Sequence, residues 1–333
     1  MRQAFLVITM LYFSILSASA DLKKGIEAYE AEDYATALSE FQPLADQGVP
    51  EAQSQLSRLY YHGYGVRKNY KKAGELAKAA AEKGDKIGEN MLGLLAIDGL
   101  GTKKDLKAAE KYFLSSAEKG FLSAQLNLAG MYWIGDLGEK DYKQALYWYH
   151  KAAKQGSEEA FYRIGYAYML GLNGTETEGK PNLKEAYDWF HKGAVKDDPF
   201  SQILLAKLVG TEISDPSGKD IPHDVVSAYF LFKKAEKPLM LRFPNEMKAN
   251  TTMKSEVAIA RRALAAMEEK MTPEQKTAAL ELLASWKPGT ALPGILAKPD
   301  NEEKPAETQP SETPSAEPPQ SETQPEAQPA ESQ

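Results

Sequence analysis

The chain repeats itself with a period of 36 residues, and this repetition limits its possible folds more than any other feature. Two columns of identical residues keep the spacing over four units. The first column holds Gly48, Gly84, Gly120 and Gly156. The second column holds Ala37, Ala73, Ala109 and Ala145. Both columns then take one step of 41 residues, which places an insertion within 174–181. Independent columns in one register indicate a tandem array of similar structural units.

Each unit contains two helical patterns joined by a glycine turn. Gly63-Tyr64-Gly65 and Gly99-Leu100-Gly101 are two of these turns, and glycine ends a helix cleanly because it reaches positive φ without steric cost. The second pattern starts near Tyr142, and its apolar residues fall at helical spacing as far as Gly156. One such hairpin cannot cover its own apolar face, whereas stacked hairpins can. We therefore predict an all-α fold, a right-handed α/α solenoid of about six helical hairpins over residues 21–236.

Residues 237–290 are predicted to form capping helices that cover the last apolar face of the array. Thr272 supplies a side-chain cap, and Pro273 and Glu274 follow it as typical first-turn residues. The sequence therefore predicts a helix that starts at this point.

The repeated residues resemble a Sel1-like repeat, the longer relative of the tetratricopeptide repeat. One unit carries the pattern most clearly, in Leu92-Gly93, Gly99-Leu100-Gly101, Asp105, Ala108-Ala109, Tyr112-Phe113 and Ala117-Glu118-Lys119-Gly120. The resemblance covers roughly residues 22–236, and the first unit is closer to a plain tetratricopeptide hairpin. It implies a non-enzymatic protein–protein interaction scaffold or adaptor in the bacterial cell envelope, which would hold an envelope enzyme, a sensor or a secretion component.

Residues 1–20 have the features of a secretory signal peptide. Arg2 precedes an apolar run over residues 4–16, and Ala18-Ser19-Ala20 supplies small residues before Asp21. The run is shorter than the ~20 residues that a membrane-spanning helix needs. We expect cleavage near Ala20-Asp21, no stable membrane insertion afterwards, and a periplasmic or secreted protein.

The last part of the chain, residues 291–333, is predicted to be a disordered acidic tail. Residues 297–333 contain eight prolines, two lysines and nine acidic residues. Such a composition cannot bury enough apolar surface to offset the entropy lost on ordering. The tail is interpreted as a solvated spacer, or alternatively as a polyanionic tether for a basic partner.

Charge and cysteine content exclude several function classes. The tail accounts for the whole net charge of −7, because the rest of the chain has 38 basic and 38 acidic residues. Without a basic surplus, a nucleic-acid partner is not expected. The absence of cysteine excludes disulfides, thiolate zinc sites and cysteine nucleophiles.

The titratable residues give no metal or cofactor signal. His150 and His191 share one repeat column with two lysines, which predicts a solvated helix face rather than a pair of metal ligands. The acidic pairs Glu158-Glu159 and Asp197-Asp198 are predicted to be exposed charges at helix starts. We therefore expect no cofactor.

One catalytic motif occurs, and the repeat register argues against it. Ser116 and Lys119 match the Ser-x-x-Lys pattern of penicillin-recognising enzymes. The repeat column of Ser116 also holds Ala80, Ala152 and Gly193, which predicts a packing position. The Ser-Asp-Asn and Lys-Thr-Gly companions are absent as well. We predict no catalytic residue and no enzymatic activity.

The candidate site is the variable surface of the first helices, which should line the concave face of the solenoid. Aromatic and arginine side chains there suit a protein or peptide partner. The candidate partner-binding residues are Gln55, Arg58, Tyr61, Asn127, Trp133, Arg163 and Tyr166. Two other functions stay open, an accessory or enzyme that acts on cell-wall material and a secreted effector that binds a host protein.

Overall fold

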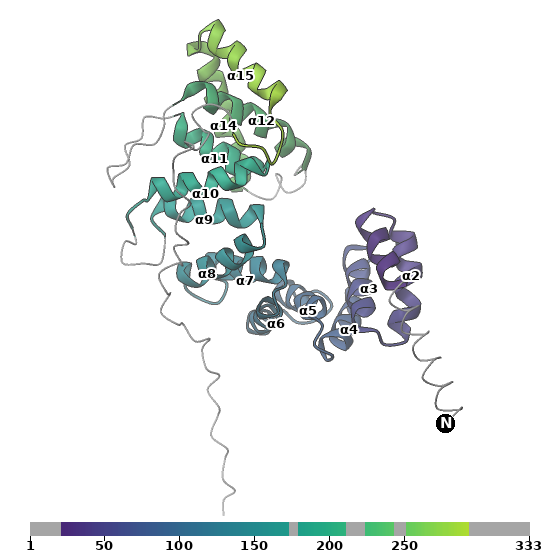
Figure 1. Ribbon diagram of the computed structural model, residues 1–333. Coiled ribbons are helices and arrows are strands. Elements are labelled where there is room, and N and C mark those ends of the chain that lie inside the picture. The colour runs from purple at the N-terminus through teal and green to yellow at the C-terminus, as the bar shows by residue number, and fades with distance from the viewer. Residues whose placement is uncertain (1–20, 173–178, 211–223, 243–250, 293–333) are drawn as a thin grey trace, which may run out of the picture. The chain divides into compact units, whose positions relative to one another are not determined.

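The computed structural model describes residues 21–172, 179–210, 224–242 and 251–292 (Figure 1). All regular elements in these ranges are helices, so the all-α prediction is confirmed. The predicted signal peptide, most of the insertion within 174–181 and the predicted tail after residue 292 lie outside the described residues.

The helices follow one another as hairpins. Residues 21–30 are helical, and they are followed by α2 (Tyr34–Asp46), α3 (Pro50–His62), α4 (Tyr70–Ala81), α5 (Lys86–Asp98), α6 (Leu106–Glu118), α7 (Leu122–Ile134), α8 (Tyr142–Lys154), α9 (Glu158–Leu170), α10 (Leu183–Val195), α11 (Pro199–Val209), α12 (Val225–Arg242), α14 (Thr251–Lys270) and α15 (Pro273–Ser285). From α2 to α12 each helix packs on the next, and α3 also contacts α5 (Figure 1). These contacts between successive pairs define a solenoid.

Two columns set the ends of the helices in the four hairpins from α3 to α10. The first helices of four hairpins end at glycines with φ between 67° and 84°, namely Gly63, Gly99, Gly135 and Gly171. The second helices begin after side-chain caps that accept a hydrogen bond of 2.9–3.1 Å from a backbone amide, namely Asn69, Asp105, Asp141 and Asn182. A left-handed glycine and an Asx cap thus fix each inter-helix turn.

Small and large residues interlock inside the hairpins. A methyl group added at Gly93 would lie 2.5 Å from Phe113, and one added at Gly165 would lie 2.6 Å from Phe190. Ala129 stands in the same column as these glycines, at a position that is fully buried. The repeated small residues therefore let the two helices of a hairpin approach closely around a ring.

A polar ladder links neighbouring hairpins. Lys83 Nζ donates to the carbonyl oxygen of Gly48 at 2.5 Å, and Lys119 Nζ donates to that of Gly84 at 3.0 Å. Gln155 Nε2 repeats the contact on Gly120 at 3.2 Å. Carbonyl oxygens near a helix end lack intrahelical partners. Each of these side chains therefore supplies a hydrogen bond to such an oxygen in the preceding unit.

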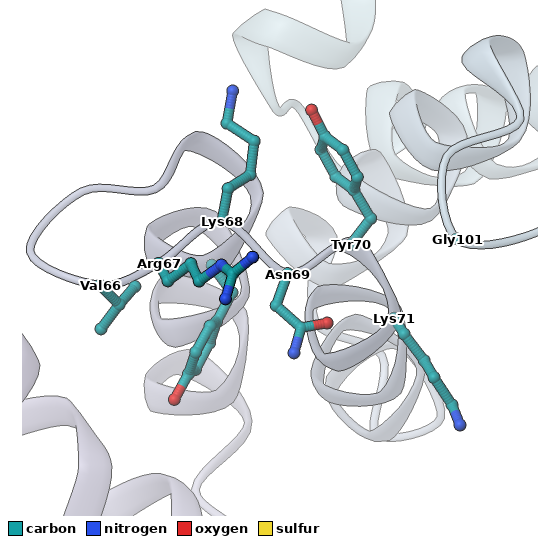
Figure 2. A pocket seen from close by; sticks show the side chains of 8 residues that line it. Val66, Arg67, Lys68, Asn69, Tyr70, Lys71 and Gly101 are labelled. Atoms are coloured by element: carbon teal, nitrogen blue, oxygen red, sulfur yellow. The ribbon is translucent and has the colours of Figure 1, made fainter.

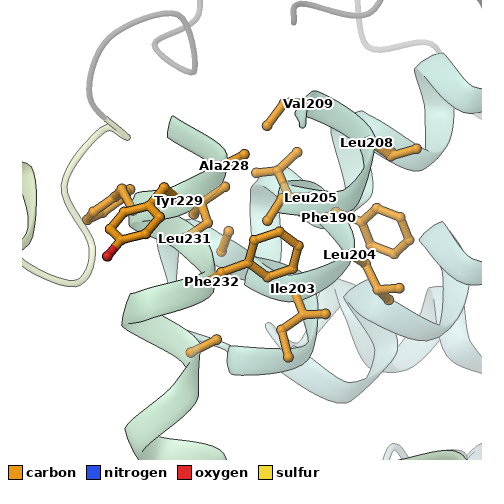
Figure 3. Packing of buried hydrophobic residues seen from close by; sticks show 14 of the residues in the cluster. Phe190, Ile203, Leu204, Leu205, Leu208, Val209, Ala228, Tyr229, Leu231 and Phe232 are labelled. Carbon is orange, nitrogen blue, oxygen red and sulfur yellow. The ribbon is translucent and has the colours of Figure 1, made fainter. Parts of the chain in front are cut away.

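The last hairpin is covered by the C-terminal helices. Figure 3 shows side chains of α10, α11 and α12 converging, including Phe190, Leu205 and Phe232, all of which are buried. Both α14 and α15 contact α12, and the Trp286 ring meets Phe230 edge-on with centroids 6.0 Å apart. Thr272 and Gln275 form a reciprocal capping box at the start of α15. Helices therefore cover the last hairpin, and the predicted helix start at Thr272 is confirmed.

Candidate functional site

The structure places the seven predicted residues in two groups. Gln55, Arg58 and Tyr61 lie on α3, whereas the other four lie on α7 and α9. Gln55 is buried, with 7% of its surface exposed, and its Oε1 accepts a hydrogen bond from Arg58 Nη1 at 2.8 Å. Gln55 is therefore placed to orient Arg58 rather than to meet a partner.

The α3 group is the centre of a row of aromatic rings. Tyr34 and Tyr64 stack with centroids 4.4 Å apart, and His62 stacks on the other side of Tyr64 at 4.9 Å. Tyr61 continues the row, with an edge contact to His62 at 4.9 Å. The guanidinium of Arg58 lies 4.3 Å from the centroid of Tyr29, which itself meets Tyr34 at 5.6 Å.

The protonation of this group is set by burial and by neighbouring cations. Burial raises the pKa values of Tyr29 and Tyr61, so both phenols stay protonated at neutral pH. Burial, followed by the positive charges of Arg58 and Lys68, lowers the pKa of His62. The imidazole is therefore neutral at pH 7.

The second group surrounds a partly buried tryptophan. The Trp133 ring contacts Tyr142 at 5.1 Å, Tyr149 at 6.3 Å and Tyr166 at 6.4 Å between centroids, so α7, α8 and α9 together hold it. Asn127 donates to Asn90 Oδ1 at 3.0 Å and links α7 to α5. The structure thus brings Trp133 and Tyr166 together, while Asn127 is engaged between the two first helices.

Arg163 is held against its own helix. Its guanidinium carbon lies 5.0 Å from the Tyr162 ring centroid, and Nη2 lies 3.5 Å from a carboxylate oxygen of Glu159. The Nε atom is buried and has no hydrogen-bond partner in the described part of the chain. The side chain is one-third exposed, so it can still contact a partner at the edge of the α9 surface.

Sequence reasoning missed the column next to the predicted one. Ile134 and Leu170 end α7 and α9, and they leave 63% and 42% of their surfaces exposed. His62 occupies the same column on α3. The signal was available, because two large aliphatic residues recur here immediately before the glycine that ends the helix.

The Ser-x-x-Lys motif does not form a nucleophilic site. Ser116 is fully buried, and its hydroxyl donates to the Lys86 carbonyl oxygen at 2.6 Å. Lys119 Nζ is engaged elsewhere, 2.6 Å from Glu89 and 3.0 Å from the Gly84 carbonyl oxygen. The packing role predicted for Ser116 is confirmed.

Two predictions about titratable residues are wrong. His191 is buried rather than solvated, and His150 packs edge-on against Trp189 at 5.2 Å, where burial lowers its pKa to about 4. Asp198 is also buried, because it caps α11 and accepts from the Ser201 amide at 2.7 Å. Burial raises the pKa of Asp198 to about 6. His150 packs against Trp189 of the next hairpin, and Asp198 is buried at the start of α11. The residue types in a repeat column did not reveal this burial.

The described residues offer little for a metal ion or a membrane. These residues contain no cluster of three or more His, Asp or Glu side chains that could hold a metal. None of their helices has both the length and the apolar character to cross a bilayer. A depression of about 750 Å³ is lined by Tyr60, Val66, Arg67, Lys68, Asn69, Tyr70, Lys71 and Gly101. The side chains of Lys68 and Lys71 point in different directions there (Figure 2). A small-molecule site needs polar groups that converge, so this lining does not favour one.

Stacked helical hairpins with variable outward-facing residues define the class of the protein as an α/α solenoid repeat protein. The Sel1 repeat profile matches residues 50–85, 87–121, 122–157, 159–198 and 217–237. The chain belongs to the Sel1 repeat family. Proteins of this family generally mediate protein–protein interactions and are typically non-enzymatic scaffolds.

Solved structures agree with this membership. A Sel1 repeat protein from Oxalobacter formigenes is 30% identical, with a TM-score of 0.54, over 74% of this chain and 98% of that protein. The protective antigen c5321 of uropathogenic Escherichia coli, which has the SLR fold, is 24% identical with a TM-score of 0.56. That match covers 80% of this chain and 60% of the antigen. No curated protein matches the chain.

Proposed function

We propose that this protein is a non-enzymatic adaptor of the bacterial cell envelope that binds a protein or peptide partner through α7 and α9. The observation that carries the proposal is the pair Ile134 and Leu170, which are exposed at 63% and 42% in one repeat column. Ile134 directly follows Trp133, whose ring contacts three tyrosines. Leu170 lies four residues after Tyr166, which is one of these three. Pre-ordered aromatic rings beside exposed aliphatic side chains are typical anchors of protein interfaces.

Residues 1–20 support the envelope location. The positive start at Arg2, the apolar run and the small residues before Asp21 together have the pattern of an exported precursor. Mass spectrometry of the mature N-terminus tests the location, and so does recovery in the osmotic-shock fraction. Recovery only from the culture medium would instead favour the secreted effector.

The binding role is tested by photo-crosslinking in cells with a crosslinking amino acid at position 130. Gly130 suits this use because a Cβ atom added there would meet no atom within 4 Å. We expect a defined partner to be captured by the otherwise unchanged chain. Capture should be lost in an Ile134→Gln, Leu170→Gln double variant and reduced by Trp133→Ala or Arg163→Ala.

Leu280 on α15 provides the matched control, because it is an aliphatic residue with 55% of its surface exposed. Leu280→Gln should leave capture unchanged. Equal capture by the double variant and by the unchanged chain would refute the α7–α9 site. Turnover of peptidoglycan that is lost in Ser116→Ala would support the alternative of a cell-wall enzyme and overturn the adaptor role.

A further inference from the structure

A second surface with different chemistry lies at the α3 end of the array. Six rings form one continuous row, defined here as the tyrosine cluster, and its members are Tyr29, Tyr34, Tyr64, His62, Tyr61 and Tyr70. The rings come from the helix over 21–30, from α2, α3 and α4, and from the turn after α3. Tyr64 is 36% exposed, so the row reaches the surface.

Two cations border the tyrosine cluster without a carboxylate partner among the described residues. Arg58 is engaged by Gln55 and the Tyr29 ring, and Lys68 Nζ lies 5.9 Å from the Tyr70 ring centroid. Carboxylates also lie near the cluster, and one of them is Glu32, whose charge adds to burial in raising the pKa of Tyr34. Asp33 caps α2 by accepting a hydrogen bond from the Thr36 amide at 3.1 Å. Asp98 adds to the effect of burial and raises the pKa of Tyr61.

The rings themselves also favour an anion. The edge of an aromatic ring carries a partial positive charge, and a stack such as Tyr34, Tyr64 and His62 buries ring faces rather than edges. Phenolic hydroxyls donate hydrogen bonds to carboxylates, and a guanidinium can bind a carboxylate through two parallel hydrogen bonds. An acidic side chain would meet donors and positive charge together at this place.

The next units do not repeat this chemistry. The column of Arg58 continues with Leu94 and Gly130, and the column of His62 continues with Asp98 and Ile134. The column of Lys68, in contrast, continues with Lys104, whose Cβ lies against Gly99 as that of Lys68 lies against Gly63. The combination of Arg58 with the ring row is therefore particular to the α3 unit, whereas the lysine recurs.

We propose that the tyrosine cluster, together with Arg58 and Lys68, binds an acidic segment of the protein partner. This inference rests on the proposed function and adds the chemistry of the partner to it. Opposite charges would steer the acidic segment to α3 and fix its register, as complementary charges do at protein interfaces.

Fluorescence anisotropy with two labelled twelve-residue peptides tests the inference on the full chain. One peptide alternates Glu and Ala, and the other alternates Gln and Ala. We expect the Glu peptide to bind at least about tenfold more tightly at low salt and to lose this advantage at 1 M salt, where the Debye length falls to about 3 Å. Equal binding of the two peptides would overturn the proposal.

Variants locate the binding. The double variant Arg58→Gln, Lys68→Gln should weaken binding of the Glu peptide by about tenfold or more. A loss of this size is expected when at least one hydrogen bond between charged groups is removed. Lys104→Gln is the matched control and should stay within about twofold of the unchanged chain. Circular dichroism confirms that the double variant is folded. Unchanged binding by the double variant would refute the site.

Two further outcomes separate this inference from its alternatives. Tighter, Arg58-dependent binding of a single-stranded oligonucleotide of equal charge would define a polyanion site and reject the acidic-peptide assignment. In cells, absence of any captured partner at position 130 refutes the proposed function. Capture of a partner that is insensitive to Arg58→Gln with Lys68→Gln refutes only the present inference.

Discussion

The C-terminal ends of α3 and α7 occupy the same place in the repeat but present opposite chemistry. The end of α3 carries Arg58, Tyr61 and His62, whereas the same columns of α7 carry Gly130, Trp133 and Ile134. The turns that follow are alike, because both helices end at a left-handed glycine with φ of 77° and 84°. The difference shows that one framework can carry unrelated binding surfaces.

The helix α11 extends this comparison. It is also a first helix, yet nine of its eleven residues are buried. The reason is local, since α12 packs on it and the C-terminal helices cover that hairpin. A repeat position is therefore a binding surface only where no later element covers it.

The largest expected effect comes from breaking the framework beneath the α7 surface. Trp148 is 4% exposed and lies in the core shared by α6 to α9. Trp148→Ala should lower the free energy of unfolding by ~3–5 kcal/mol, as for other large core truncations. Urea unfolding followed by circular dichroism measures the change. The adjacent Tyr147, which is 42% exposed, supplies the control, and an equal loss in Tyr147→Ala would contradict the core assignment.

Protonation of His150 is expected to destabilise the same hairpin in acid. Burial, then Lys192 and Lys154, lowers its pKa from 6.5 to about 4. Between these values the unfolded chain binds a proton that the folded chain excludes, so stability falls as pH drops, by at most ~3 kcal/mol. Asp198 has the opposite slope, because its pKa is raised to about 6. The unchanged chain must therefore be compared with His150→Gln, whose stability advantage should grow from pH 7 to pH 4.

Two glycines sharpen the distinction between framework and surface. A methyl group on Gly93 would lie 2.5 Å from Phe113, whereas one on Gly130 would meet no atom within 4 Å. We expect Gly93→Ala to destabilise the protein by ~1–3 kcal/mol through overpacking. Gly130→Ala should instead stabilise it by up to ~1 kcal/mol, because alanine favours the helix. Thermal unfolding of both variants decides, and shifts of the same sign would contradict the packing described here.

The parts of the structure that follow from local chemistry could be predicted from the sequence. The glycine turns located the hairpins, and the small-residue column identified Ser116 as a packing residue. The predictions of exposure failed where another part of the chain covers the helix. Asp198 and His191 are buried where α11 packs on α10, and Gln55 is buried on α3 although its column predicted contact with a partner. Column composition does not report such coverage.

The smallest effect on stability is expected where the effect on binding is largest. Ile134 leaves 63% of its surface in water, so Ile134→Gln removes little buried area and should change the free energy of unfolding by less than ~0.5 kcal/mol. His62→Gln, in the same column of α3, leaves the α7 surface unchanged, so a loss of capture at position 130 in this variant would come from the tyrosine cluster. Paired unfolding and capture measurements on the two variants show whether the surfaces act separately. A stability loss in Ile134→Gln that matches its loss of capture would mean that the side chain belongs to the framework rather than to a binding surface.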